Sequence, residues 1–89
     1  MATEEKIRRA IKELAERKQN VTLSQIEWVM GQLAHHGKVT QVDNEHQRLY
    51  SFEGRRFGIG THHPGQKQIK AIYLKNFLQA MMETGWYED

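Results

Sequence analysis

Residues 38–59 read KVTQVDNEHQRLYSFEGRRFGI, a stretch in which runs of strand-forming residues alternate with turn residues. Its valine, tyrosine and phenylalanine residues favour strands, and its Asp-Asn-Glu and Glu-Gly segments favour turns. Glu53-Gly54 is typical of a tight hairpin turn. The stretch therefore predicts a meander of three antiparallel strands, at residues 38–42, 48–52 and 55–59.

The middle strand of this meander has two distinct faces, because successive side chains of a strand point to opposite sides. Arg48, Tyr50 and Phe52 fall on one face, and Leu49 and Ser51 fall on the other. Large aromatic side chains favour burial, so we expect the face with Tyr50 and Phe52 to lie toward the core.

Two helices are predicted before the strands. The first starts near Thr3, and the second starts at Thr22, which forms a capping box with Gln25. Gly37 follows the second helix at a position that suits a left-handed cap residue. The apolar face of the first helix consists of Ile7, Ala10, Ile11 and Leu14.

A third helix is predicted after the strands, from about Lys67 to Thr84, with Gly85 as its stop. Lys70 falls near the apolar face of this helix. The element order is α-α-β-β-β-α, so we predict a single α+β domain spanning residues 1–89. It consists of a three-stranded antiparallel sheet with helices on one face. This arrangement resembles the double-stranded RNA-binding domain fold, in which shape and phosphate contacts dominate recognition.

Composition limits the possible classes of function. The 89 residues include no cysteine, which excludes disulfides and thiolate metal sites, and no apolar run long enough to cross a membrane. The polar N-terminus is not typical of a secretory signal, so we expect a cytoplasmic location.

The net charge is only +2, but residues 47–82 contain six basic residues and one acidic residue, Glu53. Such a local excess of positive charge attracts phosphate groups.

Two segments carry a resemblance to a known family. NVTLSQI at residues 20–26 opens a helix, and THHPGQKQIKAIYLKNFL at residues 61–78 places histidines and lysines before the final helix. In these features the chain resembles the HicA-type toxins over nearly its whole length. The resemblance implies a metal-independent ribonuclease of a toxin–antitoxin system, which a HicB-type antitoxin neutralises.

The resemblance also implies a catalytic histidine, which the family carries in a Gly-Ser-His motif entering a strand. The corresponding stretch here reads DNEHQRLY, residues 43–50, and lacks the glycine and the serine. An ungapped match puts Gln47 at the catalytic position, and a shift of one residue puts His46 there. Histidine suits the role, because a pKa near neutrality lets it accept the 2′-hydroxyl proton or protonate the leaving oxygen. His46 is therefore the candidate catalytic residue.

Seven side chains are candidate contacts for RNA phosphates. Guanidinium groups match the geometry of phosphate, and the N-terminus of the last helix favours anions beside nearby imidazoles and lysines. The candidates are Arg48, Arg55, Arg56, His62, His63, Lys67 and Lys70. We expect no metal ion, because no acidic or cysteine partner stands at ligand spacing from the paired histidines, and we expect no cofactor.

Three interpretations of the function remain open from the sequence. The first is a HicA-like ribonuclease that uses His46, with RNA and a HicB-type antitoxin as partners. The second is a HicA-like domain that has lost cleavage and binds RNA or a protein. The third is a winged-helix-type DNA-binding protein, because two helices followed by a β-hairpin can mimic that module. The third interpretation leaves the long C-terminal helix unused and lacks a third helix before the hairpin.

Overall fold

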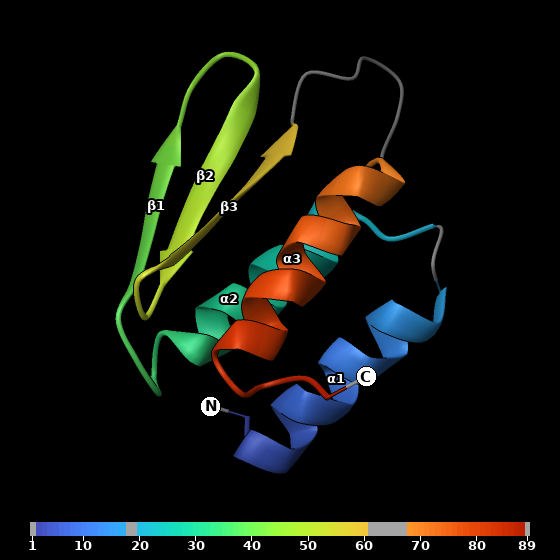
Figure 1. Cartoon of the computed structure of the whole chain (residues 1–89), viewed down its shortest axis with the longest axis vertical. Coiled ribbons are helices and arrows are strands. Elements are labelled where there is room, and N and C mark those ends of the chain that lie inside the picture. The colour runs from blue at the N-terminus through green and yellow to red at the C-terminus, as the bar shows by residue number, and fades with distance from the viewer. Residues whose placement is uncertain (1, 18–19, 61–67, 89) are drawn as a thin grey trace.

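The computed structural model describes residues 2–17, 20–60 and 68–88. Two helices come first, a three-stranded antiparallel sheet follows, and a third helix packs on the sheet, which confirms the predicted α+β class and element order (Figure 1). The elements are α1 (Glu4–Arg17), α2 (Leu23–Leu33), β1 (Val39–Asp43), β2 (Gln47–Phe52), β3 (Arg55–Gly60) and α3 (Ala71–Glu83).

The elements form three layers, with the sheet on one side, α2 and α3 against it, and α1 farthest from it (Figure 1). The main contacts of α1 are with α2 and α3, and α3 packs closely on β3. One cluster of buried side chains connects the layers, including Ile7 of α1, Ile26 of α2 and Phe77 of α3. The helices thus cover one face of the sheet, as the sequence indicates.

The strands are paired in sequence order, β1-β2-β3, without a break in register. The inner face carries the buried side chains of Tyr50, Phe52, Phe57 and Ile59, which confirms that the face with Tyr50 and Phe52 lies toward the core. The turn between β2 and β3 is also confirmed. Glu53 has a φ of 50° and Gly54 a φ of 81°, as a type I′ hairpin turn requires.

The start of α2 agrees with the sequence, and its end does not. The Thr22 hydroxyl accepts a hydrogen bond from the Gln25 N–H, and the Gln25 side chain accepts one from the Thr22 N–H, which completes the predicted capping box. The prediction of a left-handed cap at Gly37 is wrong, because α2 ends at Leu33 and the positive-φ glycines among the described residues are Gly54 and Gly85.

The last helix begins later than the sequence predicts. Gln68 forms a β-bridge with Thr22, and the Ile69 N–H donates to the Val21 carbonyl oxygen at 2.8 Å. These contacts keep the chain extended up to Lys70, which is the N-cap of α3 and lies outside its apolar face. The predicted first residue of the helix, Lys67, lies outside the described residues.

The end of the last helix is confirmed. Gly85 has a φ of 81°, its N–H donates to the Met82 carbonyl oxygen, and the Trp86 N–H donates to the Met81 carbonyl oxygen. This pattern is a Schellman motif, which needs a left-handed residue where Gly85 stands. In the part of the chain that the structure describes, no helix combines the length and apolar character needed to cross a membrane.

Candidate nucleic-acid interface

The candidate catalytic residue lies at one end of the sheet, which we call the His46 end. The turn between β1 and β2 is here, and Gln47 at the start of β2 pairs with Gly60 at the end of β3. The chain continues from Gly60 into residues 61–67, which include His62, His63 and Lys67 and lie outside the described residues. Strand pairing therefore puts His46 at the same end of the sheet as Gly60.

A side-chain turn holds the backbone at His46. The Asn44 carboxamide oxygen accepts hydrogen bonds from the N–H groups of His46 and Gln47, at 2.9 and 2.8 Å. Asparagine favours such turns because its short side chain mimics a backbone carbonyl. The His46 side chain is 74% exposed, and its Nε2 lies 4.0 Å from the Glu45 carboxylate. The imidazole is thus accessible to a substrate as large as RNA.

The N-termini of α2 and α3 lie at this same end of the molecule. The bridge between Thr22 and Gln68 and the hydrogen bond from Ile69 to Val21 tie the two helix starts together. Lys70, the N-cap of α3, is exposed there. Free N–H groups and the helix dipole make a helix N-terminus favourable for anions. The Lys70 side chain cannot accept hydrogen bonds from these N–H groups, because an ammonium group has no acceptor. Lys70 and the start of α3 therefore suit phosphate.

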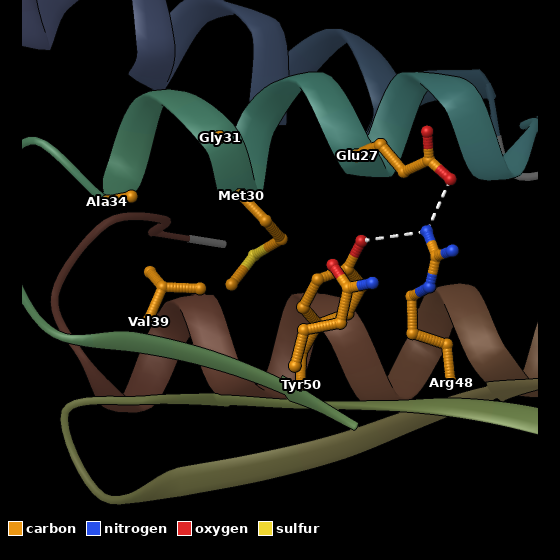
Figure 2. A pocket seen from close by; sticks show the side chains of 8 residues that line it. Glu27, Met30, Gly31, Ala34, Val39, Arg48 and Tyr50 are labelled. Atoms are coloured by element: carbon orange, nitrogen blue, oxygen red, sulfur yellow. Dashed lines mark hydrogen bonds and ion pairs between the residues drawn. The ribbon is translucent and has the colours of Figure 1, made fainter. Parts of the chain in front are cut away.

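Arg48 differs from the other candidates, because its charge is balanced within the protein. Its side chain lies on the inner face of β2, where its Nη1 contacts the Glu27 carboxylate (Figure 2). Its Nε donates to Asp43 Oδ1 at 2.7 Å. The Tyr50 hydroxyl lies 3.4 Å from Nη1. The Arg48 side chain is 19% exposed. Hydrogen bonding to Asp43 raises the pKa of Arg48, and the same contact lowers the pKa of Asp43.

This arginine forms one end of an open groove of about 470 Å³ between α2 and the strands β1 and β2 (Figure 2). The other end of the groove is apolar, and Gly31 contributes no side chain to it. A Cβ atom built on Gly31 would have no neighbour within 4 Å among the described residues. The α2–β1 groove is lined by Glu27, Met30, Gly31, Ala34, Val39, Gln41, Arg48 and Tyr50.

Arg55 and Arg56 lie at the opposite end of the sheet from His46. They begin β3 directly after the Glu53-Gly54 turn, and both are exposed. The described candidates are therefore not brought together on one surface. His46 and Lys70 share one end, Arg48 is enclosed by carboxylates, and Arg55 and Arg56 share the far end.

Sequence reasoning missed the two acidic partners of Arg48. Asp43 carried a usable signal, because the strand register pairs Asp43 directly with Arg48 and cross-strand neighbours of opposite charge attract. Glu27 lies 21 positions away on α2, and no local pattern connects it with Arg48. Within residues 2–17, 20–60 and 68–88, no group of three or more histidine or acidic side chains could hold a metal ion.

Comparisons with known proteins add no further assignment. No protein-family model matches the chain, and no curated protein or solved structure was found to be similar to it.

Proposed function

We propose that the chain binds RNA at the His46 end of its sheet and cleaves it without a metal ion, as a HicA-like ribonuclease. The observation that supports this most strongly is the pairing of Gln47 with Gly60. This pairing brings an accessible imidazole to the sheet end at which β3 ends. Lys70 and the start of α3 lie at that end as well.

The proposed reaction needs an acid and a base beside one phosphodiester. The His46 imidazole takes the proton from the ribose 2′-hydroxyl, and the 2′-oxygen attacks phosphorus. The bond from phosphorus to the 5′-oxygen breaks, a 2′,3′-cyclic phosphate forms, and the leaving 5′-oxygen receives a proton from solvent water. Positive charge from Lys70 and the helix N-termini stabilises the charge that develops on the phosphate oxygens.

The ion pairs of Arg48 remove this arginine from the proposed phosphate contacts. Asp43 ends β1 close to the turn that holds His46, and an uncompensated carboxylate there would repel phosphate. Arg48 donates to that carboxylate, but it also pairs with Glu27, so two carboxylates share its single positive charge. In this proposal Arg48 reduces the repulsion that Asp43 alone would exert on RNA, and it does not contact phosphate itself. A cytoplasmic location and a HicB-type antitoxin belong to the same proposal.

Cleavage is tested with a labelled RNA incubated with the purified protein in the presence of EDTA. We expect cleavage products that end in a cyclic phosphate, and we expect His46→Ala to abolish them. His35→Ala is the matched control, because His35 is an exposed histidine that follows the C-terminal end of α2. Equal cleavage by wild type and His46→Ala would contradict the catalytic role of His46.

RNA binding is measured in parallel, so that binding without cleavage is recognised. We expect Lys70→Ala to weaken binding several-fold and to reduce its dependence on salt. A variant with one phosphate contact fewer releases fewer counterions from the RNA when it binds. Lys12→Ala, an exposed lysine on α1, serves as the control and should have no effect. Intact RNA together with salt-dependent binding would support the non-catalytic alternative, and a flat salt response would contradict phosphate contact.

A further inference from the structure

The edge of the sheet formed by β1 is open. In Figure 1, β1 is the outermost strand, and among the described residues no other strand pairs with its outer side. The sequence of β1, VTQVD, contains neither lysine nor proline, and its register with β2 has no bulge. Its one charged side chain, Asp43, is paired with Arg48 of the same chain. Lysine, proline, bulges and unpaired charges are features by which natural edge strands prevent pairing with another chain. An edge without them is suited to accept a strand.

The hydrogen bonds of β1 with β2 reveal which backbone groups this edge offers. The Asn44 N–H donates to the Gln47 carbonyl oxygen, and the Lys38 carbonyl oxygen accepts from the Glu53 N–H. Because hydrogen-bonded residues alternate along an antiparallel strand, residues 38, 40, 42 and 44 face β2. The backbone groups of Val39, Gln41 and Asp43 therefore point away from the sheet, toward the open edge.

The outer face of the sheet carries an apolar row that ends at this edge. Val42 pairs with Leu49, and Leu49 pairs with Gly58, so the three residues lie side by side across the strands. Val42 is 60% exposed and Leu49 is 40% exposed. A neighbour beyond β1 would cover the exposed side of Val42.

We propose that β1 pairs antiparallel with β1 of a second copy of this chain, with Val42 opposite Val42 on the two-fold axis. In this register each Gln41 lies opposite Asp43 of the second copy, and the two residues exchange the backbone hydrogen bonds that both direct outward. The two Val42 residues form a non-hydrogen-bonded pair, in which Cα atoms approach to about 4.5 Å and the side chains pack closely.

The side chains of β1 favour a second copy as the occupant, because the strand is complementary to itself in this register. The Gln41 carboxamide already donates to Asp43 within the chain, at 3.2 Å, so the same donor suits the carboxylate of the second copy. The apolar row becomes continuous across the axis, from Leu49 through both Val42 side chains to the second Leu49. The α2–β1 groove separates α2 from β1 and leaves the inner side of the edge accessible.

The oligomeric state of the full chain tests this pairing. We expect sedimentation equilibrium to give twice the 10.5 kDa chain mass at high protein concentration. Val42→Lys should give a monomer, because like charges would meet on the axis. Gln41→Pro should also give a monomer, since it removes an N–H that points outward and spares the ladder with β2. Ile72→Lys, which changes an exposed residue of α3, is the control and should remain dimeric.

Cysteine substitution tests the register, because the natural chain contains no cysteine. We expect Val42→Cys to form a disulfide-linked dimer rapidly under mild oxidation. Thr40→Cys is the matched control on the same face of β1, and it should cross-link far more slowly, because in the proposed register residue 40 faces residue 44. A monomer at every concentration, or a dimer that persists in both Val42→Lys and Gln41→Pro, would overturn the proposal. Neither outcome depends on RNA binding.

Discussion

Arg48 contributes to the protein through its two carboxylate partners. It connects β2 to α2 through Glu27 and to β1 through Asp43, so its ion pairs join neighbouring elements. Its guanidinium also lies 6.0 Å from the centre of the Tyr50 ring. A cation that links two strands and a helix helps to fix the position of α2 over the sheet.

The contact between Arg48 and Asp43 predicts a dependence of stability on pH. The pKa of Asp43 is lowered from 3.8 in the folded protein, mainly by its hydrogen bond from Arg48. A lowered folded-state pKa gives a stabilising contribution that is present above pH 3.8 and is lost as the pH falls through the folded-state value. We therefore expect Asp43→Asn to be less stable than wild type at pH 7 and to approach it as the pH falls below about 3.8.

Chemical denaturation at a series of pH values measures this effect. Glu16→Gln, which changes an exposed carboxylate on α1, is the control for a general change in net charge. A stability difference between wild type and Asp43→Asn that stays constant down to pH 2 would contradict the assigned cause.

At the scale of single residues, sequence reasoning succeeded where the deciding contacts are local. The turn at Asp43-Asn44-Glu45 was predicted, and the hydrogen bonds of Asn44 that hold it are made two and three residues away. Lys70 was predicted inside a helix, because no local pattern shows that the Ile69 N–H bonds to Val21, 48 positions earlier. Interactions between distant residues therefore decided the positions that the sequence did not predict.

Within α2 and the segment after it, two glycines have opposite roles. Gly31 lies inside the helix, where glycine is unfavourable, and a Cβ there would meet open space. Gly37 lies against the sheet, where a Cβ would contact the Glu53 carboxylate and would lie 2.8 Å from Cε1 of the buried Phe52 ring. Gly37 is therefore needed for space, although its φ is not positive.

Alanine substitutions should separate these two roles. We expect Gly31→Ala to raise the free energy of unfolding by about 0.5–1 kcal/mol, because alanine favours the helix and has room. Gly37→Ala should lower it, because Phe52 and Glu53 must move. Thermal and chemical denaturation of the two variants measure both changes, and a destabilised Gly31→Ala variant would show that the space beside Gly31 is filled.

The elements themselves were largely predictable, because short-range signals define them. The capping box at Thr22, the turn at Glu53-Gly54 and the stop at Gly85 were each correct. The end of α2 was misplaced, because glycine serves both left-handed caps and close contacts, and the sequence does not distinguish the two at Gly37. The late start of α3 depends on the bridge between Gln68 and Thr22, which only the folded chain forms.

For the whole molecule, one small core holds the layers together. Phe77 of α3 is fully buried, and its ring packs edge-on against Phe57 of β3, with centroids 5.5 Å apart. Phe57 in turn packs against Tyr50 of β2, at 5.4 Å. This chain of aromatic rings carries the contact between α3 and the sheet.

Removal of the Phe77 ring should therefore affect the entire fold. We expect Phe77→Ala to lower the free energy of unfolding by about 3–5 kcal/mol, through lost apolar burial and the cavity that remains. The total free energy of unfolding of a small domain is about 5–15 kcal/mol, so the midpoint of thermal unfolding should fall steeply. Ile72→Ala, at an exposed position of the same helix, should change stability by less than about 0.5 kcal/mol, and equal losses in both variants would contradict the assigned role.

The sheet pairs each strand with its neighbour in sequence, and this order has a consequence for how quickly the protein folds. Both hairpins close over short turns, so the sheet assembles from contacts that cost little loop entropy. The junction of Val21 and Thr22 with Gln68 and Ile69 spans about half of the chain and must close over a much longer loop. We therefore expect the contact between α2 and the start of α3 to form later in folding than the two hairpins.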